Sequence, residues 1–409
     1  MLEIKGNNTE AIVYTDNIDN SAYQQIKEIC DHPSFNNSSV RIMPDCHAGT
    51  GCVIGFTAVL AEKSVIPNIV GVDIGCGVMT SVFTTDKPVD YKALDEFIRY
   101  NIPSGMNVRD TPYELIDNSV IDDVDLICRN IKGDALRDTF INSIGTLGGG
   151  NHFIEIDRIS DNTFMLSVHT GSRNLGVRVC NYYQSLGKTV DEKLRRSIIQ
   201  KHKTAKTQEE HKAIENEVNN LPEVSPELAY ISDDIYDKYV ECMLSAMRYA
   251  KANRTVISDL IMNYLSDNEN VTQTERFDTI HNYIDWYDEE HSSIIIRKGA
   301  ISAKSGQRLC IPLNMRDGVV IGTGKGNEEW NCSAPHGSGR IMSRSQAKND
   351  IAMKDYIESM KNIHSWSVNE STIDESPMAY KASDEIIRYL ADTVDIECVA
   401  KTIYNFKAN

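Results

Sequence analysis

The stretch Gly71-Val-Asp-Ile-Gly-Cys-Gly-Val78 decides the architecture around it, because it sets a carboxylate, Asp73, and a thiol, Cys76, among three glycines. It follows a strand-like run, and glycines at these positions allow positive φ angles and the close approach of an ion or a large ligand. Asp73 and Cys76 are therefore candidate metal ligands on one tight turn. The alternative is that Cys76 is a small buried apolar residue and Asp73 a turn former.

Three histidines further along the chain extend this candidate site. His152 follows a run of three glycines, His169 follows a strand expected over 165–168, and His281 lies in an Ile-His-Asn-Tyr segment. A thiolate, a carboxylate and several imidazoles suit a first-row divalent ion such as Zn²⁺, Mn²⁺ or Co²⁺. Five ligands exceed what one tetrahedral site needs, so two ions bridged by Cys76 would use them all. Ligand types alone favour zinc.

His336 differs from the other histidines, because it lies in the segment Pro-His-Gly-Ser-Gly-Arg that ends at Arg340. Small residues leave room for a large substrate, and an arginine can bind a phosphate through two hydrogen bonds. A neutral imidazole there suits nucleophilic attack on phosphorus, although a further metal ligand or a loop histidine is the alternative. The glycine runs at 148–150 and 322–326 either cradle phosphates with backbone N–H groups or form tight turns, and neither is a Walker A loop.

Composition narrows the class of protein. The chain has 409 residues, of which 41% are hydrophobic, and its ten cysteines include no Cys-x-x-Cys pair, so we expect a large core and free thiols in a reducing compartment. No apolar run approaches the roughly 20 residues that span a bilayer, and the N-terminus lacks the pattern of a secretory signal, which predicts a cytoplasmic protein. A net charge of −17 argues against indiscriminate binding to polyanions, so a nucleic acid would need a local basic patch or metal.

The candidate residues are spread from residue 45 to residue 407, so dividing the chain would divide the site. We therefore expect one α+β domain over 1–409, with central sheets flanked by helices. Residues 187–231, charged and poor in aromatics, are expected to form a peripheral helical excursion. Helices are expected over 21–30 and 232–265, where apolar residues recur at helical spacing, a strand over 78–84, and a C-terminal helix followed by a short tail that ends near Lys407.

Taken together, these segments resemble the RtcB family of RNA-splicing ligases. The matching blocks run in family order along nearly the whole chain: MPDCHAGTG (43–51), GVDIGCGV (71–78), GTLGGGNHFIE (145–155), VHTGSRNLG (168–176), HNY (281–283), RKGAISAKSGQ (297–307), PHGSGRIMSR (335–344), DESPMAYK (374–381) and Lys407. The chain departs from the family pattern where Thr50 replaces a usual lysine, where Leu313 and Asn314 replace Gly-Ser, and where Val319 stands near an expected serine.

The resemblance implies an enzyme that uses GTP and two Mn²⁺ ions to join an RNA end bearing a 2′,3′-cyclic phosphate or 3′-phosphate to a 5′-hydroxyl RNA end, in RNA repair or tRNA splicing. It implies that His336 becomes guanylated, and Asp45 is a further catalytic candidate that would orient or deprotonate the 5′-hydroxyl. The implied manganese ligands are Asp73, Cys76, His152, His169 and His281. The implied guanylate-binding residues are Asn151, His152, Phe153, Ile154, Glu155, His281, Asn282, Pro312, Leu313, Asn314, Met315, His336, Gly337, Ser338, Gly339 and Lys407.

Arg173 and Arg340 are further candidates, as phosphate contacts. Two other functions remain open at this point: a metal-dependent phosphoesterase that opens cyclic phosphates without ligating, and a non-catalytic RNA-binding homologue. The His336 segment and Lys407 argue against the first, because a hydrolase needs no guanylated histidine. The complete set of candidate metal ligands argues against the second.

Overall fold

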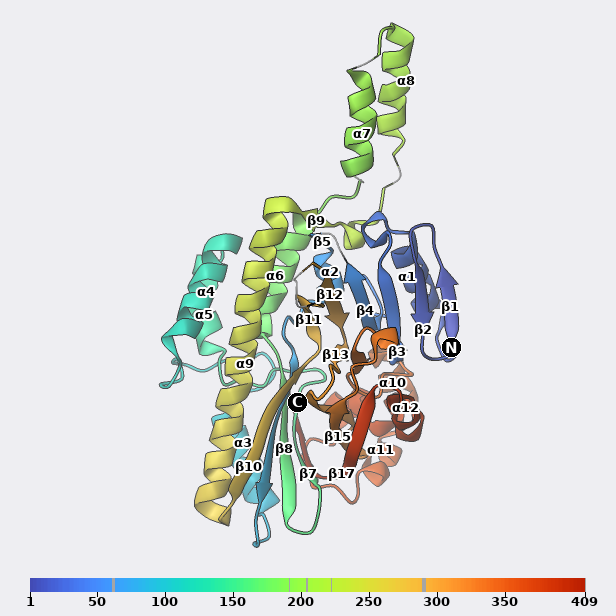
Figure 1. The fold of residues 1–409 in the computed structure, drawn as a ribbon. Helices are drawn as coiled ribbons and strands as arrows, with labels where there is room; N and C mark the ends of the chain where they lie inside the picture. The colour runs from blue at the N-terminus through green and yellow to red at the C-terminus, as the bar shows by residue number, and fades with distance from the viewer. Residues whose placement is uncertain (61–62, 191, 204, 222, 289–291, 409) are drawn as a thin grey trace.

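Two β-sheets form the centre of the computed structural model, which describes residues 1–60, 63–190, 192–203, 205–221, 223–288 and 292–408 (Figure 1). The first sheet has the strand order β1-β2-β3-β4-β12-β11. Its strands are β1 (Leu2–Lys5), β2 (Glu10–Val13), β3 (Ser39–His47), β4 (Ile54–Leu60), β12 (Ile294–Lys298) and β11 (Asn282–Trp286). One face of this sheet contributes Val40, Ile42 and Phe56, all fully buried, to the largest apolar core.

The second sheet has seven strands in the order β10-β6-β8-β7-β17-β15-β14. These are β10 (Thr272–Ile280), β6 (Gly77–Thr84), β8 (Thr163–Thr170), β7 (Phe153–Arg158), β17 (Val394–Lys407), β15 (Gly318–Gly324) and β14 (Arg308–Asn314). The backbone N–H of Cys310 on β14 donates to Thr279 Oγ1 on β10 at 3.2 Å, so the two outermost strands approach each other and the sheet curls. Small two-stranded sheets pair β13 (Ala300–Ser302) with β16 (Ser333–Pro335) and β5 (Ser64–Val65) with β9 (Ile231–Ser232).

The longest helix, α9 (Asp233–Glu269), packs against both cores and confirms the helix expected from residue 232. Its Tyr239 and Met243 belong to the core beneath the first sheet, and its Ile257 and Ile261 belong to the core beneath the second. The preceding helices are α1 (Asn20–Asp31), α2 (Pro67–Val70), α3 (Tyr91–Asn101), α4 (Asn118–Ile131), α5 (Arg137–Asn142) and α6 (Arg173–Ser185). α2 corrects the strand-like run expected before Gly71: a proline at its first turn starts a helix there instead.

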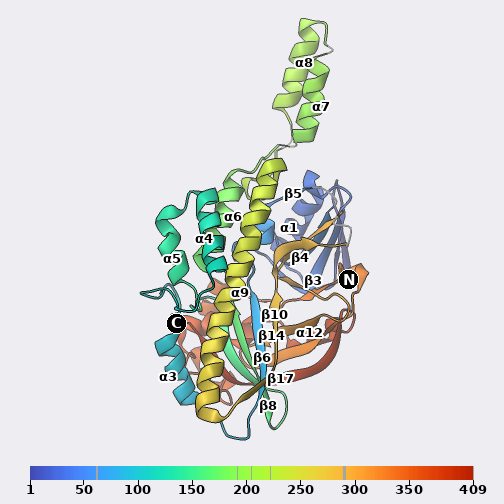
Figure 2. The same ribbon diagram turned by 60° about the vertical axis from the view of Figure 1, so that its left-hand side comes forward.

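Two helices, α7 (Glu192–His202) and α8 (Gln208–Asn219), project from the rest of the molecule in both views (Figures 1 and 2). They fall within the excursion expected over 187–231. The chain leaves and rejoins the body at one point, because Lys188 and Tyr230 exchange backbone hydrogen bonds of 2.8 and 3.1 Å. α8 buries no residue, which agrees with its charged composition.

The C-terminal segment differs from the expected helix and tail. The helix is present as α12 (Ser383–Leu390), but residues 394–407 form β17, a 14-residue strand paired with both β7 and β15. Lys407 is therefore held in a sheet. The remaining elements are α10 (Arg344–Asp350), α11 (Met353–Ser359) and the 3₁₀ turns η1 (Pro33–Phe35), η2 (Asp134–Leu136), η3 (Pro226–Leu228), η4 (Glu328–Trp330), η5 (Glu370–Glu375) and η6 (Pro377–Ala379).

The α+β class, with central sheets flanked by helices, is thus confirmed. The strands expected over 78–84 and 165–168 are present within β6 and β8. Among the described residues, no helix combines the length and the apolar character that crossing a membrane requires.

Candidate metal centre and facing histidine

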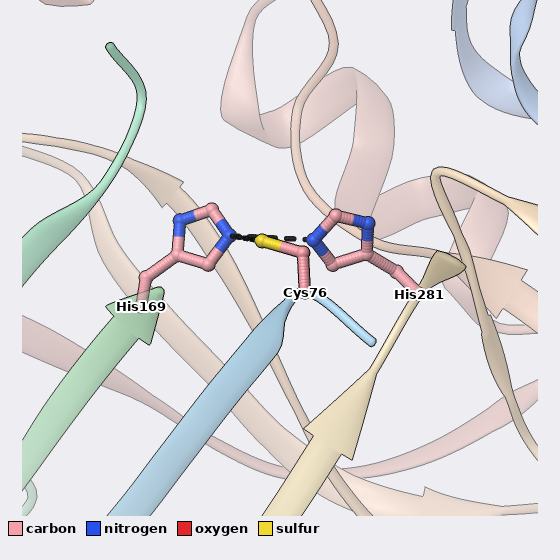
Figure 3. A group of neighbouring side chains, drawn as sticks. All are labelled: Cys76, His169 and His281. Carbon is pink, nitrogen blue, oxygen red and sulfur yellow. Dashed lines mark hydrogen bonds between the residues drawn. The ribbon is translucent and has the colours of Figure 1, made fainter. Parts of the chain in front are cut away.

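Neighbouring strands of the seven-stranded sheet present the predicted metal ligands at one end. Cys76 immediately precedes β6, His281 immediately follows β10, and His169 is the last residue but one of β8. His152 immediately precedes β7. Because β10, β6, β8 and β7 are adjacent in this order, residues far apart in sequence meet. Figure 3 shows the Cys76 thiol between the imidazoles of His169 and His281.

The five predicted ligands form two groups of three that share one thiol. Cys76, His169 and His281 make one group, and Asp73, Cys76 and His152 make the other; within each group the ligand atoms lie within 4.8 Å of one another. Cys76 Sγ lies 3.5 Å from His152 Nε2 and 3.4 Å from His169 Nε2. His169 Nε2 lies 3.3 Å from His281 Nε2, and His152 Nε2 lies 3.0 Å from Asp73 Oδ2. A shared thiol between two groups is the arrangement expected for two bridged ions.

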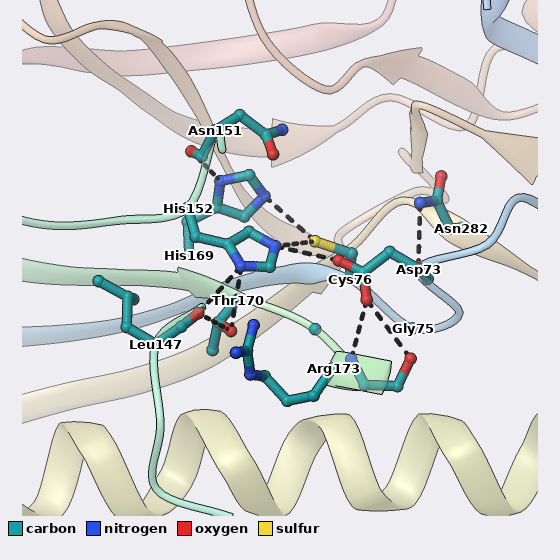
Figure 4. Close-up of polar contacts among 12 residues, drawn as sticks. Asp73, Gly75, Cys76, Leu147, Asn151, His152, His169, Thr170, Arg173 and Asn282 are labelled. Atoms are coloured by element: carbon teal, nitrogen blue, oxygen red, sulfur yellow. Dashed lines mark hydrogen bonds and ion pairs between the residues drawn. The ribbon is translucent and has the colours of Figure 1, made fainter. Parts of the chain in front are cut away.

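The second ring nitrogen of each histidine lies against an oxygen atom outside the cluster, and Figure 4 shows this for His152 and His169. An oxygen acceptor at Nδ1 favours the tautomer with its proton there, which leaves the Nε2 lone pair directed at the cluster. The acceptors are the Leu147 carbonyl for His152 at 2.9 Å, the Asn151 carbonyl for His169 at 3.2 Å, and Asn282 Oδ1 for His281 at 3.2 Å. The donor set therefore fits divalent metal.

Burial and the charges of neighbouring groups shift the pKa values of the candidate ligands. Burial and the neighbouring imidazoles hold the pKa values of His169 and His281 well below the usual range, so both rings stay neutral. Burial alone would raise the pKa of Asp73, but the hydrogen bond and charge of His152 outweigh it and lower that pKa to about 2. Burial and the charge of Asp73 raise the pKa of the Cys76 thiol. A cation at the cluster would favour the thiolate form.

The turn that carries Asp73 and Cys76 is fixed from below by α9. Gly75 has φ of +68°, and a Cβ there would lie 2.9 Å from the Cα of Met247. Arg254, which is fully buried, donates from Nη1 to the carbonyls of Gly75 at 2.7 Å and of Thr170 at 2.9 Å, and pairs with Asp278 through two bonds of 2.7 Å. Arg254 could not be predicted from the sequence, because a polar residue on a long helix gives no local indication of its partner.

His336 lies beside the ligand cluster with its ring centroid 4.7 Å from that of His281. Its Nδ1 is 2.7 Å from Asp45 Oδ2, and its backbone N–H donates to the same oxygen at 3.1 Å. This pairing leaves Nε2 as the ring nitrogen available for chemistry. Asp45 is fully buried behind the ring. We expected Asp45 to contact a 5′-hydroxyl directly. Its buried carboxylate contacts His336 instead.

A cavity of about 690 Å³ opens above the cluster and His336. Of the predicted guanylate-binding residues, it is lined by Asn151, Phe153, Glu155, His281, Asn282, Pro312, Leu313, Asn314, Met315, His336, Gly337, Ser338, Gly339 and Lys407. Ile154 does not line it: side chains alternate along β7, and Ile154 packs into the core on the opposite face. His152 lies beneath the cavity in the metal-ligand cluster, and Val319 is buried among the apolar residues inside the curled sheet.

One carboxylate organises the charged wall of this cavity. Glu375, which is almost fully buried, lies 2.7 Å from Lys407 Nζ and 2.6 Å from Arg344 Nη1, and accepts a hydrogen bond from the Tyr380 hydroxyl at 2.7 Å. Arg340, which also lines the cavity, is 3.3 Å from Glu375 and donates to two backbone carbonyls, and its expected phosphate contact stays a prediction. Arg344, half-exposed on the cavity wall, is the more accessible cation. Both Arg344 and Glu375 lie in sequence blocks already singled out.

Arg173 and the glycine runs also have packing roles. Arg173 donates to Thr146 Oγ1 at 3.1 Å and to the Gly105 carbonyl at 2.9 Å and is absent from the cavity wall, which corrects its expected phosphate contact. A Cβ on Gly148 would lie 1.7 Å from the Arg173 guanidinium, so this glycine makes room for Arg173. The run at 322–326 belongs to β15 and the following turn, away from the cavity wall. For both runs the structure favours close packing over a phosphate cradle.

The fold and this site define an α+β protein with a buried Asp/Cys/His cluster that could hold metal and a carboxylate-paired histidine at the edge of that cluster. The sequence model of the family described as "tRNA-splicing ligase RtcB" matches residues 25–132 and 129–408, and the chain belongs to this family. RNA ligation is accordingly its enzymatic class, and RNA its substrate.

Individual relatives agree with this assignment. The chain is 29% identical to the RNA-splicing ligase RtcB of Escherichia coli K12, over 93% of this chain and 92% of that protein. It is 27% identical to the tRNA-splicing ligase RtcB of Aeropyrum pernix, over 84% of this chain and 82% of that protein. It is 26% identical to the RNA-splicing ligase RtcB2 of another Escherichia coli strain, over 91% and 88% respectively.

Proposed function

We propose that the protein joins an RNA 3′-phosphate or 2′,3′-cyclic phosphate to an RNA 5′-hydroxyl, with GTP as the energy source, two manganese ions as cofactors and His336 as the nucleophile. The observation that carries the proposal is the pairing of His336 with Asp45 at 2.7 Å, beside two ligand groups that share Cys76. A simple hydrolase has no need of such a histidine.

The metal ions would be held by the two groups described above. Cys76, His169 and His281 would bind one ion, and Asp73, Cys76 and His152 the other. When bound, divalent ions stabilise negative charge on phosphate oxygens at the attacking and leaving positions. The ligand types alone also suit zinc; manganese is proposed from the family resemblance.

In the first step, the Nε2 lone pair of His336 would attack the α-phosphorus of GTP. A P–N bond forms, the bond between the α-phosphorus and the bridging oxygen breaks, and pyrophosphate leaves. The ring becomes positively charged at this moment, and the Asp45 carboxylate at Nδ1 is placed to stabilise it. We therefore assign Asp45 the role of positioning His336.

In the second step, an oxygen of the RNA 3′-phosphate would attack the guanylated histidine. The P–N bond breaks and GMP passes to the RNA, so that the 3′-phosphate acquires a good leaving group. In the third step the 5′-hydroxyl of the second RNA end attacks that phosphate, the new phosphodiester forms, and GMP leaves. A 2′,3′-cyclic phosphate must first be opened by water to give the 3′-phosphate.

The guanosine would occupy the cavity between β7, β14 and β17. Lys407 and Glu155 lie in its wall and offer hydrogen-bonding groups to a base, and Pro312 to Met315 form a second wall. Leu313, where the family has glycine, adds a side chain to the cavity wall and so restricts the orientations in which a nucleotide can bind. Thr50, where the family has lysine, contributes its carbonyl to Lys298, which donates to three backbone carbonyls in this region.

The test is incubation with α-³²P-GTP and Mn²⁺, followed by a denaturing gel. We expect an acid-labile, base-stable label on the wild type and none on His336→Ala. Asp45→Asn should bind the same amount of metal but label at least tenfold more slowly, since removing an orienting group leaves binding intact.

Two results would contradict the proposal. A wild type that binds metal and opens cyclic phosphates without acquiring label would be a phosphodiesterase. A wild type that binds RNA but neither labels nor opens cyclic phosphates would be a binding protein.

A further inference from the structure

A second hollow, of about 460 Å³, lies outside the catalytic cavity. It borders the start of α3, at the end of the molecule opposite the projecting helices α7 and α8 (Figures 1 and 2). Its lining combines aromatic and basic residues: Lys87, Pro88, Val89, Asp90, Tyr91, Lys92, Arg158, Phe164, His364 and Trp366. We call this lining the aromatic–basic hollow.

Four rings in the hollow and beneath it form a ladder. Tyr404 stacks on Tyr91 with centroids 5.9 Å apart, Tyr91 on His364 at 4.9 Å, and His364 on Trp366 at 6.5 Å, with interplanar angles between 11° and 22°. The inner end is anchored, because Tyr404 is buried and its hydroxyl donates to Asp95 at 3.0 Å. The outer end, Trp366, is 45% exposed. Solvent-exposed aromatic rings are the surfaces on which unpaired bases stack.

Charge in the hollow is opposite in sign to that of the whole chain. Lys87, Lys92 and Arg158 line it, against the single carboxylate of Asp90, whereas the chain carries −17 overall. Asp90 already accepts two N–H bonds at the start of α3. A local basic patch on an acidic protein is the feature that phosphate binding requires.

The hollow is connected to the catalytic cavity through β17. His364 pairs with Tyr404, and three residues further along the strand the backbone N–H of Lys407 donates to Ser367 Oγ at 3.1 Å. Lys407 lines the catalytic cavity. At about 3.3 Å per residue, the strand covers roughly 10 Å between these points. A few unpaired nucleotides span such a distance.

We propose that the aromatic–basic hollow binds an unpaired segment of the RNA substrate a few nucleotides from the end that is joined, with one base stacked on Trp366 and phosphates near Lys87, Lys92 and Arg158. The inference rests on the proposed function only for the identity of the ligand. It assigns to this ligase a contact with RNA that is separate from the residues of the reaction.

The test measures binding of a 5′-fluorescein-labelled unpaired 12-nucleotide RNA with a 3′-phosphate by fluorescence anisotropy, with the full-length protein. Trp366→Ala should weaken binding about tenfold, the loss of one stacked base. Trp366→Phe should bind nearly as tightly as the wild type, because a ring remains. The matched control is Trp286→Ala, which removes a tryptophan of similar exposure outside the hollow and should change nothing. Replacing Lys87 and Arg158 by glutamine should lower the salt dependence of log Kd by about 0.7 per cation.

Labelling with α-³²P-GTP in the same variants separates this inference from the proposed function. Trp366→Ala should acquire label like the wild type. A variant that loses RNA binding but keeps its label would support an RNA-binding role for the aromatic–basic hollow. If neither the wild type nor any variant acquires label, the proposed reaction is wrong. The comparison of RNA binding between the variants still tests whether the aromatic–basic hollow binds RNA. The inference is overturned if Trp366→Ala binds RNA as tightly as Trp286→Ala, which would point to a protein partner, or if Trp366→Phe loses as much binding as Trp366→Ala.

Discussion

Replacing Glu375 by glutamine perturbs the charged wall of the cavity most directly, because three cations, Lys407, Arg344 and Arg340, lose their shared buried partner. Lys407 and Glu375 are only 5% and 3% exposed as side chains. Burial alone raises the pKa of Glu375, but Lys407 and Arg344 outweigh it and lower that pKa from 4.5 to about 2. Each pKa unit corresponds to about 1.4 kcal/mol. The carboxylate therefore contributes about 3 kcal/mol to stability at neutral pH, in line with the cost of breaking a buried ion pair.

The sign of the pH dependence follows from the lowered pKa. Since the folded-state pKa lies below the unfolded-state value of 4.5, the contribution is present above pH 4.5 and is lost as pH falls toward 2. We expect Glu375→Gln to unfold in urea with about 3 kcal/mol less stability than the wild type at pH 7. Between pH 7 and pH 4 that difference should shrink by about 1 kcal/mol.

Glu358→Gln is the matched control, because its ion pair with Lys361 is exposed, at 71% and 59% of the two side chains. An exposed pair of this kind contributes less than about 1 kcal/mol. Circular dichroism during urea titration measures both variants. A Glu375→Gln protein within about 1 kcal/mol of the wild type at pH 7 would refute the reasoning, and so would a difference that grows as pH falls.

Two further predictions concern the ligand cluster and the interior of the curled sheet. Cys76→Ala removes the ligand shared by both groups, so bound manganese measured by elemental analysis should fall from two ions per chain to below one, whereas Cys310→Ala, at a buried thiol inside the sheet, should retain two. Retention of both ions by Cys76→Ala would exclude the bridged arrangement. Asp157 is fully buried beside Glu155. Burial, and to a lesser extent the charge of Glu155, raises the pKa of Asp157 well above its usual range. The folded state therefore keeps the proton that the unfolded state loses, and the protein loses stability as pH rises. Asp157→Asn should therefore lose less stability than the wild type as pH rises from 4 to 6, just above the unfolded-state value of 3.8, measured as urea midpoints; equal changes in both proteins would contradict this explanation.

Local sequence was sufficient to pick out the side chains that the fold gathers into a candidate ligand cluster, because each lies next to a strand end or a glycine turn. Asp73 and Cys76 share one turn, and His152 and His169 each adjoin a predicted strand, so residue type and position together indicated metal. The long helix and the charged excursion were also predictable, because the first has a helical apolar pattern and the second lacks a face to bury. Both kinds of signal depend on residues close together in the chain.

The remaining features depend on contacts between distant segments. β17 has the alternating pattern of a strand, yet only its pairing with β7 and β15 brings Lys407 to the cavity. Only the tertiary structure shows that Arg340 pairs with Glu375, and that the Asp45 carboxylate lies behind His336. The aromatic ladder takes its rings from α3, β17 and the segment after α11.

Sequence alone thus determined which chemical groups this protein carries and that they belong to one α+β fold, because glycine turns, strand ends and helical periodicity are encoded by neighbouring residues. Tertiary structure alone decided which of those groups are available to a substrate. Availability depends on which buried charge pairs with which, and those partners lie tens to hundreds of residues apart in the chain, as Asp45 and His336 do.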